Sequence, residues 1–328
     1  MGHEQGRLRF EYELTDDEGS VTSYGGLPVV LDYMRSLGAT ASIGRNVQIA
    51  ARSRKHDEPW VVEALVMLLA AGGDCLDDIE VLRSDRALQR LLERELPSAE
   101  TLRKFLYSFH DETLMAAAQQ AAAAKGEKAF VPEESAPLAG LAQVLTDFVA
   151  GVAARGHGKR ATLDIDATIQ ESHKREATEH YQGGRGYQPV TAYWAEQDLV
   201  VADEFRDGNV PAGKETLRLV KRAFAALPSS IEDRRLRSDS AMYNAETIRW
   251  LIEERIAFSI SADMGKHLRE VCVAVDESKW ELVETRANEQ VHVCEVSFFP
   301  GNWPKSMVSP TSSSARAKSS ACLLRPIP

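Results

Sequence analysis

Strand and helix patterns over residues 160–262 constrain the fold more than any other feature of the chain. Three short segments rich in β-branched and aromatic residues, "RATLDIDAT", "PVTAYWAE" and "LVVADEFR", follow one another. An amphipathic helix pattern, the strand pattern "RRLRSDS", a second helix pattern and "AFSISADM" complete the order β-β-β-α-β-α-β. Strands without an intervening helix form an antiparallel meander, and strands that alternate with helices add in parallel. The pattern predicts a mixed five-stranded α/β sheet.

This order is that of the ribonuclease H-like arrangement, in which the first and fourth strands lie side by side. The residues before the sheet have helical periodicity, and the residues after it are rich in Ser and Pro without any period. The predicted regions are an N-terminal hairpin (1–26), a mainly helical region (27–155), an incomplete ribonuclease H-like core (156–299) and a disordered or frameshifted tail (300–328).

Composition narrows the class of protein. The net charge of −10 argues against a uniformly basic nucleic-acid coat, although a local basic groove can lie on an acidic protein. Four cysteines without a C-x-x-C spacing favour a reduced, cytoplasmic chain without a zinc site. The most apolar run, from Trp60 to Ala71, contains Glu63 and is too short to span a bilayer. It is predicted to be a buried helix, so no membrane partner is expected.

The stretch "EFRDGNVPAGKETL", residues 204–217, nearly matches the phosphate-binding pattern G-x-x-x-x-G-K-[ST]. Glu215 occupies the position where such a loop needs a hydroxyl for magnesium. Pro211 lacks the backbone N–H that the loop would point at a phosphate oxygen. A nucleotide hydrolase is therefore an alternative that rests on this stretch alone, and a Gly/Pro turn leading into a helix is the favoured interpretation.

Asp166 and Asp239 lie at positions that matter in this architecture. Asp164 and Asp166 share one face of the first strand, opposite Leu163 and Ile165, and Asp239 ends the fourth strand. If the first and fourth strands are neighbours, Asp166 and Asp239 converge. Close carboxylates are stable together mainly when a cation lies between them, and hard oxygen ligands favour Mg²⁺ or Mn²⁺. The pattern thus predicts a metal site; the alternative is that strand-end aspartates only form turns or cap helices.

Basic residues surround these acids in the sequence. A phosphodiester backbone needs such positive groups, and solvated surface charge is the alternative for each of them. His173 is the histidine closest to the first strand that could take part. The candidate DNA contacts are Lys174, Arg175, Arg185 and Arg237.

Five segments in order resemble the DDE transposases of bacterial insertion sequences, in the subgroup with a group 1 DDE domain. They are "LDIDATIQESHK", "YQGGRGYQP", "EFRDGNVPAG", "RSDSAMYN" and "FSISADM". "SYGGLPVVLDYM" and "GGDCLDDIEVLRSDRALQRLL" fit the helical region that precedes catalysis in that subgroup. The resemblance covers roughly residues 8–305.

The resemblance implies metal-dependent cleavage and strand transfer of DNA at the ends of a mobile element, with Mg²⁺ or Mn²⁺ as cofactor. Asp166 in "DAT" matches the first catalytic acid and Asp239 in "SDSA" the second, with Asp164 a weaker substitute for Asp166. The implied partners are double-stranded terminal-repeat and target DNA. The helical region is then the candidate DNA-binding region, and whether the chain forms a homodimer is left open.

The sequence departs from the family after "GNWPK", near Lys305. The family continues with more sheet and with a helix that supplies a glutamate as the third acid. Glu281, Glu284 and Glu295 fall in a strand-like segment on the wrong side of that insertion. The expectation is a truncated or frameshifted transposase without catalysis. The alternative is a DNA-binding, repressor-like product that occupies element ends.

Overall fold

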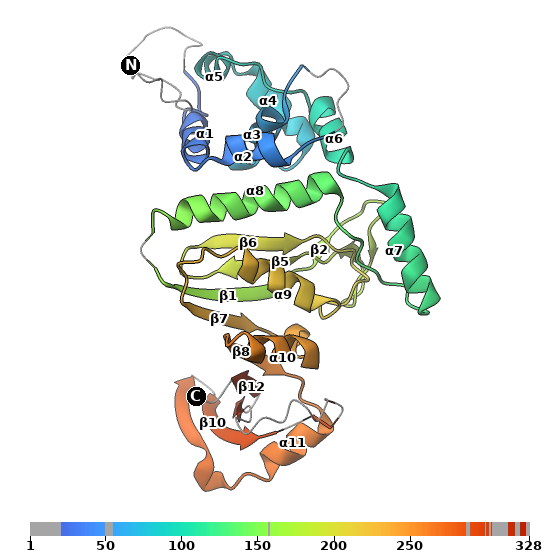
Figure 1. Ribbon diagram of the computed structural model, residues 1–328, viewed down its shortest axis with the longest axis vertical. Helices are drawn as coiled ribbons and strands as arrows, with labels where there is room; N and C mark the ends of the chain where they lie inside the picture. Colours follow the sequence, from blue (N-terminus) through green and yellow to red (C-terminus); the bar gives the residue numbers. More distant parts are fainter. Residues whose placement is uncertain are drawn as a thin grey trace. The chain divides into compact units, whose positions relative to one another are not determined.

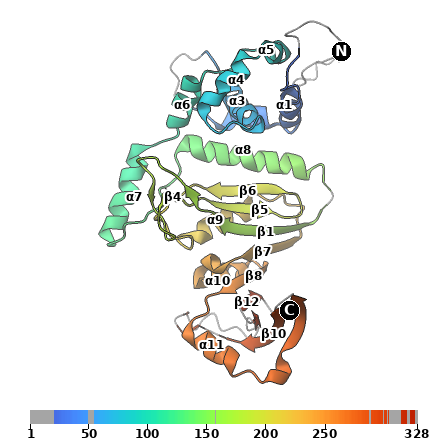
Figure 2. The same cartoon turned by 180° about the vertical axis from the view of Figure 1, so that it is seen from behind.

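The computed structural model describes residues 21–49, 55–156, 158–286, 289–298, 300–301, 303, 314–318 and 322–325 (Figures 1 and 2). The chain divides into two compact units, which are described separately below. The helical unit comprises residues 1–127 and 132–155, and the sheet unit comprises residues 128–131 and 156–328. Most of the hairpin predicted for residues 1–26 lies outside the described residues.

The helical unit is built around α3, Glu58–Ala70, which begins at the N-cap Asp57. The Asp57 carboxylate accepts a hydrogen bond from the backbone N–H of Trp60 at 3.1 Å, which fixes the start of the helix. Its side chains on several faces are buried, including Trp60 and Met67, as predicted for the most apolar run. The other helices are α1 (Leu27–Ser36), α2 (Ala39–Asn46), α4 (Ile79–Ser84), α5 (Arg86–Leu92), α6 (Ala99–Tyr107), α7 (Glu112–Ala124) and α8 (Ala136–Ala153), with a 3-10 turn at Leu76–Asp78.

One carboxylate lies inside this apolar core. Glu63 on α3 is 2% exposed and accepts two hydrogen bonds from the Arg35 guanidinium, at 3.0 and 2.7 Å. Thr40 donates its hydroxyl to the same carboxylate at 2.6 Å. The bond to Glu63 raises the pKa of Arg35 above its usual value. A buried charge is tolerated only with such partners, so these three residues tie α1 and α2 to α3.

Helix α8 is the one helix in the described part of the chain that is long and apolar enough to cross a membrane, judged by length and composition alone. A single helix of this kind is weak evidence of a membrane span, because core helices of soluble proteins pass the same test.

The sheet unit contains a sheet of nine strands within the described residues, in the order β6-β5-β1-β7-β8-β12-β11-β10-β9. The five predicted strands are neighbours at one end of this order, β6-β5-β1-β7-β8. The first three pair antiparallel and the last two add in parallel, as the sequence predicts. β1 pairs antiparallel with β5 and parallel with β7, and β7 pairs parallel with β8. Their bounds are β1 (Arg160–Ala167), β5 (Val190–Trp194), β6 (Leu199–Glu204), β7 (Asp233–Ser238) and β8 (Ala257–Ala262).

Helices α9 (Thr216–Ala225) and α10 (Ala245–Glu253) make the two crossovers (Figure 1). α9 buries Leu219, Val220 and Phe224, and it contacts β5 and β6. The amphipathic spacing of these residues puts one apolar stripe against the sheet, which explains why this segment is a helix. The side chain of Asn244 caps α10 by accepting from the backbone N–H of Thr247 at 2.9 Å.

The remaining strands lie outside the predicted five-strand order, although the segment that contains Glu281, Glu284 and Glu295 was expected to be strand-like and forms β9 and β10. Three short strands, β2, β3 and β4, follow β1 and precede β5 in the sequence, and they form a separate small sheet. Helix α11 follows β8. Two strands fall in the segment predicted to be disordered, so that prediction differs from the structure at those residues. There the backbone groups of β11 and β12 pair with each other and with β10 and β8. The bounds are β2 (Gln170–Glu171), β3 (Thr178–Glu179), β4 (Arg185–Tyr187), α11 (Lys266–Val273), β9 (Glu281–Arg286), β10 (Glu289–Ser297), β11 (Ser314–Lys318) and β12 (Cys322–Arg325).

Candidate functional site

The carboxyl ends of β1 and β7 bring the two predicted acids to one edge of the sheet. The parallel ladder ends at the pair Ile165 and Ser238. Asp166 is the next residue of β1, Asp239 directly follows the last residue of β7, and neighbouring strands lie about 4.8 Å apart. The register therefore brings both aspartates to the same edge of the sheet, one residue beyond the last paired residues of β1 and β7.

Both aspartates are exposed, and neither forms a salt bridge in the described part of the chain. Asp166 Oδ1 accepts a hydrogen bond from the N–H of Ala167 at 2.8 Å. Asp239 Oδ1 accepts from the N–H of Ala241 at 2.9 Å and so caps the 3-10 turn Ser240–Met242. The turn-forming role considered for Asp239 is thus present, but it occupies one carboxylate oxygen only. The geometry leaves carboxylate oxygen on both residues for a hard cation.

Asp164 has a different environment from Asp166, although they share a face of β1. The Arg237 guanidinium donates to both oxygens of Asp164, each at 2.6 Å. The bond to Asp164 raises the pKa of Arg237 above its usual value. In this bidentate pair Arg237 neutralises the charge of Asp164 and occupies both of its oxygens. Asp164 is therefore a weaker candidate for a metal ligand than Asp166.

Three of the four candidate DNA contacts are engaged within the protein. Arg237 is held by Asp164, and Arg175 pairs with its neighbour Glu176 at 3.1 Å. Arg185 donates to the carbonyl of Ala177 at 2.8 Å and to that of Arg175 at 2.5 Å. These bonds fold the loop between β2 and β4. The fourth, Lys174, is exposed, as is His173.

The three glutamates considered as the third acid lie far along the sheet from the aspartate pair. Glu295 is on β10, four strands from β7, and Glu281 and Glu284 are on β9, one strand further. At about 4.8 Å per strand, Glu295 is roughly 19 Å from β7 within the sheet. Among the described residues, no three His, Cys, Asp or Glu side chains are grouped so that they could hold a metal ion.

One carboxylate at the correct edge was missed by the sequence reasoning. Asp263 is exposed and directly follows β8, whose carboxyl end lies beside that of β7. The pairing of Ser238 with Ile260 puts Asp263 two residues beyond the position level with Asp239. The signal was available in "FSISADM", because the fifth strand was predicted to run parallel to the fourth and to end at the same edge.

The loop that resembled a phosphate-binding loop is not free to cradle a phosphate. Its N–H groups already donate within the protein: Gly208 to the Gly186 carbonyl at 3.1 Å, and Asn209 to the Thr178 hydroxyl at 3.0 Å. Lys214 donates its N–H to the carbonyl of Pro211 at 2.9 Å. The stretch is a turn that leads into α9, as the favoured interpretation predicts, and these contacts argue against nucleotide binding there.

Close packing explains two glycines of this loop. A Cβ on Gly208 would lie 2.6 Å from the carbonyl oxygen of Gly186 in β4. A Cβ on Gly213 would lie 2.9 Å from the carbonyl oxygen of Ala241, in the turn that follows Asp239. The loop therefore packs on the small sheet at one end and on the turn capped by Asp239 at the other.

A buried ion cluster fixes the same loop. Glu204 is 5% exposed and accepts hydrogen bonds from Arg206 Nε at 2.6 Å and Arg218 Nη2 at 2.6 Å. Arg206 is 2% exposed, and it also donates to the carbonyl of Lys214 at 2.7 Å. Sequence reasoning missed this cluster, because charged residues near a Gly/Pro turn usually face solvent.

Comparisons with known proteins identify the family of the chain. No curated protein matches the chain. Among solved structures, one match is a piggyBac transposase synaptic complex with hairpin DNA, at 10% sequence identity and a TM-score of 0.40. That match covers 88% of this chain and 56% of the piggyBac chain, so this chain spans little more than half of that protein. The family model described as transposase DDE domain group 1 matches residues 9–308. The chain therefore belongs to the group 1 transposase DDE domain family.

Proposed function

We propose that this protein is a DNA transposase with a ribonuclease H-like core, which cleaves and transfers DNA phosphodiesters using divalent cations held by Asp166 and Asp239. The observation that carries the proposal is the placement of two exposed carboxylates, which form no salt bridge among the described residues, at the carboxyl ends of adjacent parallel strands. Family membership supports the same assignment.

The donor set fits Mg²⁺ or Mn²⁺. Carboxylate oxygens are the hard ligands these ions prefer, and two exposed carboxylates repel each other until a cation is shared. When bound, such ions activate water or a DNA 3′-hydroxyl and stabilise the charge on the leaving oxygen. Asp166 and Asp239 would hold the ions, and the pairing of Asp164 with Arg237 links β1 to β7 next to them.

The proposed partners are double-stranded terminal-repeat DNA and target DNA. Lys174 is an exposed cation in the loop that follows the strand of Asp166, and it is proposed to contact the phosphate backbone. The helical unit is proposed to supply further DNA contacts, and the protein is proposed to act in the cytoplasm. When the logarithm of DNA affinity is plotted against the logarithm of salt concentration, the line should become less steep by about 0.9 for each phosphate contact that is lost.

One observation favours a second function, that of a DNA-binding protein which occupies element ends without cleaving them. Within the described residues, no third carboxylate is grouped with Asp166 and Asp239 closely enough to share an ion. In that case the protein would bind terminal repeats and exclude an active transposase.

Cleavage and binding of terminal-repeat DNA by the parent and by Asp239→Ala separate these functions. The proposed transposase cleaves in Mg²⁺, and the variant loses at least about 100-fold in rate with unchanged binding. Asp276→Ala is a matched control, because Asp276 caps the 3-10 turn Glu277–Lys279 as Asp239 caps its own turn. It should cleave like the parent. Binding without cleavage by all three proteins would support the second function.

A further inference from the structure

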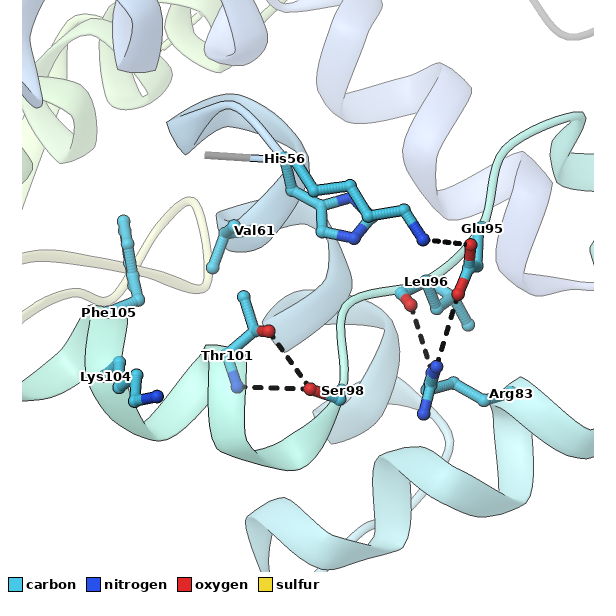
Figure 3. Close-up of a pocket in the computed structure, with 10 residues that line it drawn as sticks. His56, Val61, Arg83, Glu95, Leu96, Ser98, Thr101, Lys104 and Phe105 are labelled. Atoms are coloured by element: carbon cyan, nitrogen blue, oxygen red, sulfur yellow. Dashed lines mark hydrogen bonds and ion pairs between the residues drawn. The ribbon is translucent and has the colours of Figure 1, made fainter. Parts of the chain in front are cut away.

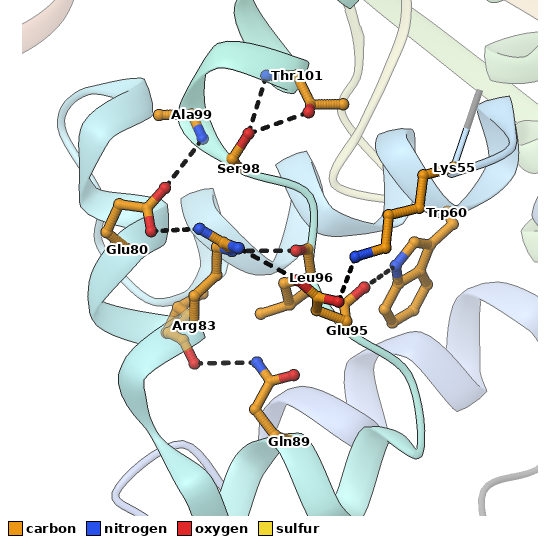
Figure 4. A network of polar contacts seen from close by, with 11 residues as sticks. Lys55, Trp60, Glu80, Arg83, Gln89, Glu95, Leu96, Ser98, Ala99 and Thr101 are labelled. Carbon is orange, nitrogen blue, oxygen red and sulfur yellow. Dashed lines mark hydrogen bonds and ion pairs between the residues drawn. The ribbon is translucent and has the colours of Figure 1, made fainter. Parts of the chain in front are cut away.

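The cavity of about 320 Å³ in the helical unit offers no free group to a ligand (Figure 3). Its apolar lining belongs to the buried core of that unit. Its basic residues already have partners: Lys55 and Arg83 bond to Glu95 at 2.5 and 3.4 Å (Figure 4). Lys104 pairs with Glu100 at 3.2 Å. A free aromatic face is found instead in the sheet unit, on the strand pair that follows Asp166.

The segment Glu204-Phe205-Arg206 reverses the usual placement of charged and apolar side chains. Glu204 and Arg206 are 5% and 2% exposed, whereas Phe205, between them, is 62% exposed. Charged side chains are almost never fully buried, and phenylalanine is among the residues most often buried. A shift of the strand by one residue would bury the ring and expose both charges. The observed register therefore presents an aromatic ring to solvent against the usual preference, and such exceptions are expected at functional sites.

Internal bonds hold the chain on both sides of Phe205. Arg206 Nε donates to the Glu204 carboxylate at 2.6 Å, and Arg206 also donates to the Lys214 carbonyl at 2.7 Å. The backbone N–H of Gln188 donates to the Arg206 carbonyl at 2.9 Å. The segment that carries the ring is thus fixed before any ligand arrives, which lowers the entropy cost of binding to it.

Phe205 lies on the same face of the sheet as Asp166. Asp166 pairs with Thr191 of β5, and Thr191 pairs with Asp203 of β6. Residues opposite each other in antiparallel strands share a face, and so do residues two apart along one strand. Phe205 is two residues beyond Asp203. At about 4.8 Å per strand and 3.3 Å per residue, the backbone at Phe205 is roughly 12 Å from Asp166.

Tyr187 supports the exposed ring. Its ring centroid is 4.8 Å from that of Phe205, with 42° between the ring planes. Tyr187 also pairs with Asp207 in an isolated bridge, so its side chain is on the same face as Phe205. These two rings form the aromatic platform (Phe205 and Tyr187). Asp203 and Asp207 flank the platform along the strand, so the apolar patch is small. It fits one flat ring, whereas a stable protein interface buries about 800 Å² on each partner.

Cations lie next to the aromatic platform. Arg185 is exposed, and it shares a face of β4 with Tyr187, two residues further on. Its guanidinium donates to the carbonyls of Ala177 and Arg175, which are neutral and so position the charge without cancelling it. Lys174 is exposed in the same loop and forms no salt bridge within the described residues. Aromatic rings for bases, with cations for the phosphates, are the combination that binds single-stranded nucleic acid.

We propose that the aromatic platform stacks one unpaired base of the DNA strand that enters the metal site. This inference rests on the proposed function, because the strand is taken to be held at Asp166 and Asp239. At about 3.4 Å per nucleotide, the stacked base is three to four nucleotides from the phosphate at Asp166. Every base has a flat face, so the platform requires an unpaired base but no particular sequence.

Binding of the full chain to two DNA probes in the absence of divalent ions tests the proposal. One probe is a duplex of about 30 base pairs with a single-stranded tail of about six nucleotides, and the other is the same duplex with blunt ends. Phe205→Leu should weaken binding of the tailed probe about 5- to 150-fold and leave the blunt probe unchanged. Phe205→Trp, which keeps a flat ring, should bind the tailed probe like the parent.

Tyr181→Leu is the matched control. Tyr181 is an aromatic residue, 76% exposed, in the turn between β3 and β4, outside the aromatic platform. Its variant should bind both probes like the parent. Thermal unfolding shows whether each variant is folded. An equal loss of tail binding in Tyr181→Leu and Phe205→Leu would overturn the assignment of the base to this platform.

Photocross-linking reports the contact itself. A tail that carries 5-iodouracil should cross-link to Phe205 or Tyr187, and peptide mass spectrometry locates the link. Links confined to other residues would contradict the proposal, as would unchanged tail binding in a folded Phe205→Leu protein. Equal weakening of both probes would mean that the ring acts on duplex binding or on the fold, and would also overturn it.

Two further outcomes are separable from these. A dimer that becomes a monomer in Phe205→Leu, with unchanged tail binding, would assign the ring to contact with a second copy and overturn the proposal. Tail binding is measured without divalent ions, whereas the metal site is measured by Mn²⁺ binding. Failure of the platform and failure of the metal site at Asp166 and Asp239 are therefore distinguishable.

Discussion

Carboxylates have opposite environments in the core of the helical unit and at the edge of the sheet. Glu63 is buried, and Arg35 and Thr40 satisfy it within the chain. Asp166 and Asp239 are exposed on adjacent strands, and the described part of the chain gives them no cation. A carboxylate that is paired with an arginine therefore stabilises the fold, whereas a carboxylate without such a partner remains available to a metal ion.

The largest effect is expected where the carboxylate is buried. Glu63→Ala leaves the Arg35 guanidinium without its partner inside the helical unit, and breaking a buried pair in this way costs about 3–5 kcal/mol. Denaturant unfolding of the helical unit measures the loss. Glu100→Ala is the control, because Glu100 pairs with Arg103 and Lys104 at the surface, and its loss should be much smaller. Equal losses in the two variants would remove the contrast.

A smaller effect is expected where the loop packs beside the sheet edge. Gly213→Ala puts a methyl group 2.9 Å from the carbonyl oxygen of Ala241, which must shift, at a cost of about 1–3 kcal/mol in unfolding free energy. The shift should also disturb the turn that Asp239 caps. Gly265→Ala meets no atom within 4 Å and serves as the control. Unfolding curves that coincide for the two variants would contradict this account of the loop.

A pH effect is expected at His56 in the helical unit. Its pKa is lowered in the folded protein, so the unfolded state takes up a proton near pH 6.5 before the folded state does. The free energy of unfolding should therefore fall as the pH drops below about 6.5. Besides burial, the cations Lys55 and Arg94 lower the pKa of His56, and the carboxylates Glu95 and Asp57 oppose that lowering. His56→Gln should remove this part of the slope in denaturant titrations. An unchanged slope would show that His56 does not contribute.

The smallest effect on stability is expected at the sheet edge. Asn caps a helical turn about as well as Asp, and Asp239 is exposed. Asp239→Asn should therefore leave the unfolding free energy of the sheet unit within about 0.5 kcal/mol of the parent. A loss of several kcal/mol would mean that Asp239 is part of the protein's structural framework and would weaken the contrast with Glu63.

The sequence predicted the parts of this arrangement that have a period or an order. Alternating residues such as Leu163 and Ile165 fixed the face of β1, and the order of strands and helices placed β1 beside β7. Asp166 and Asp239 could be placed at one edge for that reason. The two- and three-residue strands of the small sheet have no detectable period, so they were missed.

Partners of charged side chains could not be predicted from the sequence. Arg237 was a candidate DNA contact, but the side chain on the neighbouring strand that it meets is Asp164. No pattern in the sequence indicated that Glu204 and Arg206 are buried and bonded to each other. Such pairings depend on tertiary distances that no local pattern contains.

Binding of Mn²⁺ to the folded protein tests the central claim most directly. Electron paramagnetic resonance of free Mn²⁺ should show a site that Mg²⁺ competes for. Asp166→Asn and Asp239→Asn should each weaken that site at least about tenfold, while Asp276→Asn should not. Mn²⁺ affinity that is the same in the parent and in both sheet-edge variants would contradict the assignment of Asp166 and Asp239 as the metal-binding pair.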